Sequence, residues 1–171
     1  RNNQYKIMLI RRLSKLNTLL QSCASGITVA AMGIIAVVIP YEVIGRYVLS
    51  AMPVWSGEVS TYALVWASMM GGAAGMKKGY QVSITTLTDR LPDALSRPVI
   101  FSSNIIVLVF LSIMVFYGVQ QTIINQNQFS AAMGIPMSIP YAALPAGFMI
   151  MLLTCVEESW RSFHPVSGGT E

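Results

Sequence analysis

The sequence predicts an all-α integral membrane protein with four transmembrane helices. An N-terminal interfacial amphipathic helix and a short cytoplasmic interfacial helix between spans two and three are expected as well. Charged residues make up 11% of the 171 residues, whereas soluble domains carry about 25%. A helix crosses the hydrocarbon core with about 20 mostly apolar residues. Three segments long enough for this contain no Asp, Glu, Lys or Arg: residues 16–41, 59–76 and 98–156.

Polar residues and prolines divide the longest uncharged segment into two spans. It contains 59 residues, and polar residues at 120–122 and 125–128 interrupt it near the middle. Pro136 and Pro140 follow, so this stretch is expected to form a turn outside the membrane. We expect one membrane domain over residues 1–163 and a polar, glycine-rich, disordered tail over 164–171. The four spans are expected near residues 19–43, 54–76, 99–124 and 139–163.

The positive charges predict that both ends of the chain and its central loop face the cytoplasm. Ten of the 11 Lys and Arg residues precede the first span, lie between the second and third, or follow the fourth. Only Arg46 lies in the opposite set of connections. Cytoplasmic loops carry the excess of Lys and Arg, which gives the expected orientation. The basic start precedes a full-length span without a small-residue cleavage site, so no cleavable signal peptide is expected.

The segment before the first span is expected to be an amphipathic helix in the headgroup plane. A basic helix with one apolar face keeps its positive charges close to anionic lipid. The alternative is a frayed basic leader that only sets the topology. The apolar and polar residues that fall on opposite sides of such a helix are Tyr5, Leu9, Leu13, Leu16 and Leu20 against Arg11, Ser14, Lys15 and Thr18.

Glu42 and Arg46 are expected to form an ion pair at the end of the first span. A helix that starts near Leu19 places Glu42 about 35 Å along its axis, beyond a hydrocarbon core of about 30 Å. The two residues are four apart in the order that favours a helical ion pair. The alternative for this pair is a contact with a partner protein.

The second span opens with residues that suit the membrane interface. Trp55 fits the aromatic belt. Ser56 is expected to cap the helix, and Glu58 to interact favourably with the positive end of its dipole. A functional role for Glu58 is the alternative.

One face of the second span carries only small residues. Such a face lets another helix approach closely in lipid. It is therefore expected to pack against a helix of this chain or of a partner. The residues, each four apart, are Ala63, Ala67, Gly71, Gly75 and Gly79.

The segment between the second and third spans is expected to hold a short interfacial helix through about Leu91, which Pro92 ends. Asp89 and Arg90 lie away from its apolar edge. In the third span Asn104 is the most deeply placed strongly polar residue, and we expect it to hydrogen-bond another helix rather than a substrate. The apolar edge consists of Val82, Ile84, Leu87 and Leu91.

The sequence lacks the patterns that catalysis or a cofactor would need. It has one histidine, His164, so neither a haem held by two imidazoles nor a histidine-based metal site is expected. It has no glycine-rich phosphate loop, and no broken pair of helices of the kind that binds substrate in secondary transporters. Cys23 and Cys155 are expected to be small packing residues, not a disulfide. No enzyme activity and no catalytic, metal or substrate site is expected in this chain, which suits a partner of something larger.

Two other classes of membrane protein stay open. An autonomous four-helix, proton-coupled exporter would need a carboxylate in the middle of the membrane. Glu42 and Glu58 both fall at the ends of spans. The membrane anchor of a respiratory complex would need ligands for haem, and the single histidine argues against it.

The motifs at the span ends resemble those of the small membrane subunit of tripartite ATP-independent periplasmic (TRAP) transporters, the Q or DctQ-type subunit. Their order and spacing carry the resemblance over about residues 16–158. The motifs are EVIGRYV at 42–48, WSGE at 55–58, YALVW at 62–66, GGAA at 71–74, KKGYQV at 77–82, DRLP at 89–92, MGIPM at 133–137 and YAALPAG at 141–147.

The resemblance implies a bacterial inner-membrane scaffold that works with a large M permease subunit and a periplasmic substrate-binding P protein. It implies that sodium and an organic anion, such as a C4-dicarboxylate or sialic acid, bind to the large subunit, and that phospholipid fills gaps between subunits. Gln81 stands where the family often has His. A proton-transfer role at that position is therefore not expected here, whereas a hydrogen-bonding role is compatible with Gln81.

Overall fold

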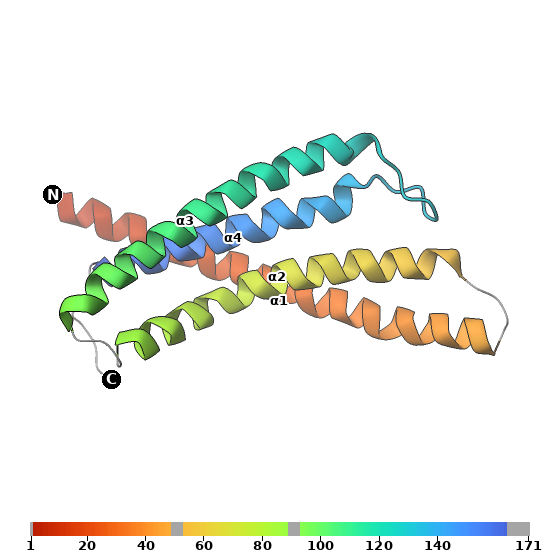
Figure 1. The fold of residues 1–171 in the computed structure, drawn as a ribbon, viewed down its shortest axis with the longest axis horizontal. Helices are drawn as coiled ribbons and strands as arrows, with labels where there is room; N and C mark the ends of the chain where they lie inside the picture. The colour runs from red at the N-terminus through yellow and green to blue at the C-terminus, as the bar shows by residue number, and fades with distance from the viewer. Residues whose placement is uncertain (1, 49–52, 89–92, 164–171) are drawn as a thin grey trace.

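The computed structural model describes the backbone of residues 2–48, 53–88 and 93–163, and the side chains of residues 14–48, 53–76 and 98–160. Four long helices and one short 3₁₀ helix contain most of these residues, with no strand among them (Figure 1). The all-α, four-helix prediction is confirmed for this part of the chain. The elements are α1 (Asn2–Tyr47), α2 (Val54–Thr88), α3 (Asp93–Ile124), η1 (Asn125–Asn127) and α4 (Ser138–Phe163).

The helices form two antiparallel hairpins, α1–α2 and α3–α4, which pack together through α2 and α4 (Figure 1). Neighbouring helices therefore follow the order α1, α2, α4, α3. The beginning of α1 and the end of α4 lie at one end of the molecule, called here the terminal end. The α1–α2 and α3–α4 connections lie at the other, called the connection end, toward which the hairpins diverge.

Small residues allow the helices to approach closely. Ala31 of α1 packs with Ala63 and Ala67 of α2 in a buried cluster. Between α2 and α4, a Cβ atom built on Gly147 would lie 3.0 Å from the Cβ atom of Met69. Within the second hairpin, a Cβ atom on Gly118 would lie 3.1 Å from the backbone nitrogen of Pro145. Each pair of neighbouring helices thus has a contact that a larger side chain would disturb.

Among the described residues, three helical segments are long and apolar enough to cross a membrane: Ser14–Tyr47, Pro98–Asn127 and Ser138–Trp160. Only 11% of the most apolar window is buried within the chain in the first two, against 33% in the third. α4 therefore lies centrally, and most apolar side chains of α1 and α3 point outward. The fourth span, in α2, stays a prediction, which the position of α2 between α1 and α4 supports.

The expected interfacial helices are not separate elements in the described backbone. α1 is continuous from Asn2, and no Pro or Gly before Gly26 interrupts it. α2 continues beyond the predicted end of its span to Thr88, because no proline follows Pro53 until Pro92. α3 begins before Pro98 rather than after it. A location in the headgroup plane stays a prediction for both extensions, and the tail over 164–171 lies outside the described residues.

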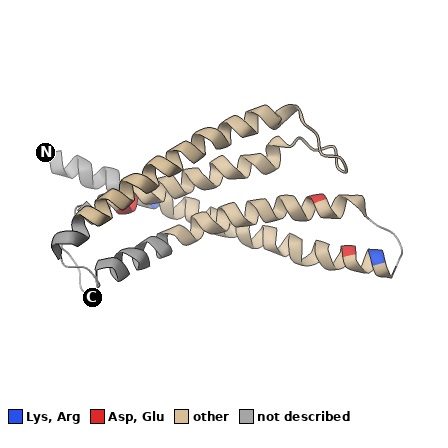
Figure 2. Ribbon diagram, in the orientation of Figure 1, with Lys and Arg blue, Asp and Glu red and all other residues tan. Residues whose placement is uncertain are grey.

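The described charged residues lie toward the two ends of the molecule (Figure 2). Residues 16–41 of α1 and 98–156 of α3 and α4 lie between them without any charge. This distribution suits helices that cross a hydrocarbon core. The charged residues are Lys15, Glu157 and Glu158 toward the terminal end, and Glu42, Arg46 and Glu58 toward the connection end.

Replacing Gly147 by Leu is expected to destabilise the isolated chain by about 1–3 kcal/mol, the usual cost of overpacking. The new side chain would meet the Cβ atom and backbone of Met69. Gly75→Leu is the matched control, since nothing lies within 4 Å of a Cβ atom there. Melting of both purified variants in detergent tests this. Equal melting temperatures for the two would contradict a tight contact between α2 and α4.

Candidate functional site

Glu58 joins α2 to the connection between α3 and α4. Its carboxylate accepts hydrogen bonds from Ser130 Oγ at 2.6 Å, Ala132 N at 2.9 Å and Met133 N at 3.1 Å. We call this set of contacts the Glu58 latch. Hydrogen bonds to a charged acceptor are about twice as strong as neutral ones. The latch therefore fixes one hairpin to the other at the connection end.

The structure gives these residues different contacts from those expected for a helix cap. Ser56 is buried, and its hydroxyl donates to Pro53 O at 2.8 Å instead of accepting from the first turn. Glu58 binds a distant segment and lies beyond the first turn of α2. Sequence spacing did not indicate this partner, because 72 residues separate Glu58 from Ser130.

The α3–α4 connection is a folded loop. Ser130 N donates to Ile135 O at 2.9 Å, and Met137 N donates to Gln128 O at 2.8 Å. Gly134 has a φ of 64°, a left-handed conformation that glycine adopts without a steric cost. Ser130 is only 5% exposed. These bonds and the latch give the loop one defined shape.

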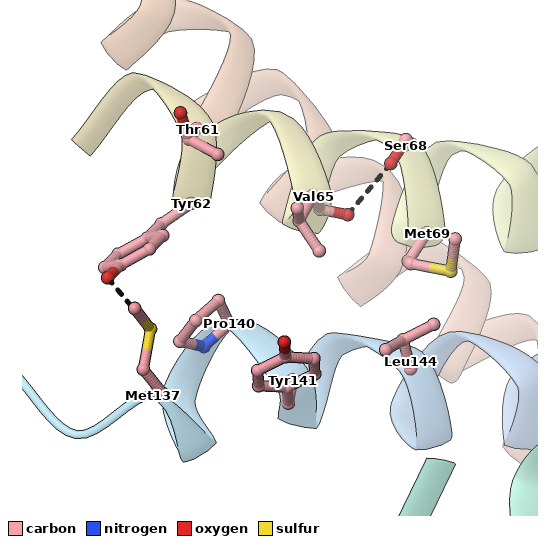
Figure 3. A pocket seen from close by; sticks show the side chains of 9 residues that line it. All are labelled: Thr61, Tyr62, Val65, Ser68, Met69, Met137, Pro140, Tyr141 and Leu144. Carbon is pink, nitrogen blue, oxygen red and sulfur yellow. Dashed lines mark hydrogen bonds between the residues drawn. The ribbon is translucent and has the colours of Figure 1, made fainter. Parts of the chain in front are cut away.

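A groove of about 410 Å³ lies between α2 and the start of α4, where the hairpins diverge (Figure 3). Near the loop, Tyr62 Oη donates to Met137 Sδ at 3.3 Å. The hydroxyls of Thr61 and Ser68 bond to carbonyl groups of their own helix. The lining is therefore mostly apolar and suits hydrocarbon rather than a charged solute. Its residues are Thr61, Tyr62, Val65, Ser68, Met69, Met137, Pro140, Tyr141 and Leu144.

The first and second helices also meet near the connection end. Arg46 and Glu42 approach to 3.9 Å on one side of α1, both partly exposed. An exposed pair at this distance contributes little to stability. The Trp55 ring stacks on Tyr41 with centroids 6.0 Å apart, which joins the two helix ends. A partner contact for any of these residues stays a prediction.

Side chains of α1 and α4 form a polar network toward the terminal end. Asn17 Nδ2 donates to Glu157 Oε2, and Thr154 Oγ1 donates to Asn17 Oδ1 at 3.1 Å. Gln21 Nε2 donates to Thr154 Oγ1 at 3.2 Å. Asn17, Thr154 and Glu157 are all buried. Our sequence reasoning missed this network, although Asn17 and Gln21 are amide residues four apart in an uncharged segment.

The remaining predicted residues divide into three groups. A Cβ atom on Gly71 would lie 3.3 Å from Thr28 Cγ2, so Gly71 is at the contact between α1 and α2. Gly75 has open space around it in this chain. Gln81 belongs to the described backbone of α2, but its side chain lies outside the described residues. Asp89, Arg90 and Pro92 lie wholly outside the described residues.

The chemistry available in the described residues is limited. They contain no group of three or more His, Cys, Asp or Glu side chains that could hold a metal ion. Cys155 is buried and Cys23 is exposed, and both are free. Buried Asn104 lies in α3. The arrangement can fix helices and present surfaces to partners.

Comparison with known proteins gives the family. Residues 35–164 match the model of the DctQ component of tripartite ATP-independent periplasmic transporters. The chain belongs to this family. A DctQ component with helices able to span a membrane is an inner-membrane protein, and small permease subunits of TRAP transporters work with a large M subunit and a periplasmic binding protein.

Three curated relatives are TRAP small permease proteins. The sialic acid TRAP transporter protein of Vibrio cholerae is 25% identical over 85% of this chain and 84% of its own length. A putative TRAP transporter small permease protein of Haemophilus influenzae is 21% identical over 71% of this chain and 76% of its own length. The ectoine TRAP transporter protein of Halomonas elongata is 23% identical over 81% of this chain and 69% of its own length.

Replacing Asn17 by Ala is expected to destabilise the DctQ component by about 1–3 kcal/mol, because the change leaves buried polar groups of Thr154 and Glu157 without this partner. Thr18→Ala is the control. That hydroxyl is exposed and bonds only to Ser14 O of its own helix. The melting temperatures of the two variants in detergent test this. If Asn17→Ala melts at the temperature of the parent, the network does not hold α1 on α4.

Proposed function

We propose that this DctQ component is the static scaffold of a sodium-coupled importer of organic anions. The large M subunit would bind sodium and substrate, and the periplasmic protein would deliver the substrate. The observation that carries this proposal is the uncharged middle of the described helices. A carboxylate substrate or a cation would find no charged partner there, since the described charges lie toward the ends.

The relatives support the substrate class. One of them belongs to a sialic acid transporter, and another belongs to an ectoine transporter. Sialic acid is a carboxylate. We propose a small carboxylate for the transporter that contains this chain. The chain itself would have no enzymatic activity, sodium site or substrate site.

We also propose that the groove between α2 and α4 holds the acyl chain of a phospholipid. Its mostly apolar lining offers no charged group to a solute. Its volume of about 410 Å³ lies within the range of about 300–1,000 Å³ that ligand pockets occupy. A bound chain would fill the space that the diverging hairpins leave open.

For the orientation, we propose that the terminal end faces the cytoplasm, as the positive charges predict. Single cysteines at Asn127 and Ser83, in a background with Cys23 and Cys155 replaced by Ala, test it. An impermeant thiol reagent on intact cells is expected to label position 127 and not 83. The reverse labelling pattern would invert the orientation.

The central test of the function is transport by reconstituted protein. We expect no uptake by this chain alone. With the large subunit and the binding protein, a sodium gradient is expected to drive uptake of a carboxylate such as sialic acid or a C4-dicarboxylate. Uptake by the lone chain would defeat the scaffold proposal, and equal uptake without sodium by the full assembly would defeat the coupling.

A further inference from the structure

We infer that the α3–α4 loop is a docking surface for the periplasmic binding protein, and that Glu58 is the positioning residue that gives this surface its shape. The inference rests on the proposed function, because it takes the binding protein as the soluble partner. It deepens that proposal by naming one contact surface and the group that orders it.

The latch pairs backbone donors of the loop tip with a carboxylate. Three hydrogen bonds reach the Glu58 carboxylate, and two of them use the backbone N–H groups of Ala132 and Met133. Because these N–H groups are already paired, the tip offers side chains to a partner rather than unpaired backbone groups. Ser130, which forms the third bond, is buried beneath the tip.

Apolar side chains nevertheless point outward from this fixed loop. Phe129 is 65% exposed and Met133 39%. Aromatic residues and Met are enriched at the cores of protein interfaces, where charged residues are depleted. A loop already held in one shape loses little conformational entropy on binding. Rigidity and composition together fit a protein-binding surface.

The location favours a soluble partner over the large subunit. One apolar helical segment ends at Asn127 and the next begins at Ser138. The loop between them therefore lies beyond the membrane-crossing parts. A membrane subunit packs alongside helices, whereas the tip lies at their end. With the terminal end in the cytoplasm, this end faces the periplasm.

The charge distribution argues against lipid headgroups as the occupant. Residues 98–156 contain no Lys or Arg, so the loop has no positive charge to attract anionic lipid. Exposed amide side chains lie at the end of α3, in η1 and at the start of the loop, and amides hydrogen-bond readily to a protein surface. They are Gln120, Gln121, Gln126, Asn127 and Gln128.

The experiment measures the affinity of the fluorescently labelled periplasmic binding protein of the same transporter for the small and large subunits together in nanodiscs. Glu58→Ala removes the latch, and Glu58→Gln keeps one of its two acceptor oxygens. The double change Phe129→Ser with Met133→Ser keeps the latch but removes the apolar tip. Tyr47→Ser is the control, since Tyr47 is exposed at the same end but belongs to α1.

We expect the Glu58→Ala and double variants to bind about tenfold or more weakly, as for hot-spot residues. Glu58→Gln is expected to fall between them and the parent. Tyr47→Ser should match the parent. All variants should still co-purify with the large subunit. A merely structural role for Glu58 would lower the melting temperature without changing this affinity.

Parental affinity in the double variant would overturn the inference, even if Glu58→Ala fails to fold. Loss of the large subunit from the double variant would also overturn it, because the tip would then be a contact within the membrane complex. A parent chain that never co-purifies with the large subunit would instead refute the proposed function, so the two failures are distinguishable.

Discussion

The close approach of α2 and α4 is the contact on which the arrangement depends. Lipid is as apolar as the helix surfaces, so helices associate in it through packing and hydrogen bonds rather than through the hydrophobic effect. Gly147 lets the backbone of α4 come against the backbone of Met69, and Gly72 leaves room for the methyl end of the Met151 side chain. Among the described helices, α2 and α4 share the most extensive contact between the two hairpins. The hairpins could not lie at this distance with larger residues there.

Polar contacts then join the hairpins on either side of this packing. The Asn17–Glu157 network holds α1 on α4 toward the terminal end, and the Glu58 latch holds the loop on α2 at the connection end. Hydrogen bonds are specific in direction, so they select one relative position among those that packing alone permits. Because both lie toward helix ends, the middle of the bundle needs no charge. That is the property expected of a scaffold rather than a conduction path.

The helices themselves could be predicted because uncharged length alone indicates a membrane span. Span ends were less predictable, since a helix can continue beyond its hydrophobic stretch, as α2 does to Thr88. Gly71 was expected at a helix contact and lies against Thr28. The four-residue spacing of small residues did not distinguish it from Gly75, which has open space around it. The partners of Glu58 and Asn17 are 72 and 140 residues away and follow only from the packed arrangement.

Cysteine cross-linking in native membranes tests the central contact most directly. Met69→Cys with Gly147→Cys, in a background with Cys23 and Cys155 replaced by Ala, should form a disulfide. The two Cβ positions lie 3.0 Å apart, so a separation of the helices by about 0.5–1.5 Å reaches the Cβ–Cβ distance of about 3.5–4.5 Å that disulfides have. Met69→Cys with Met149→Cys, whose side chain is exposed on another face of α4, should not form one. Equal cross-linking of the two pairs, or none in the first, would contradict the packing of α2 against α4.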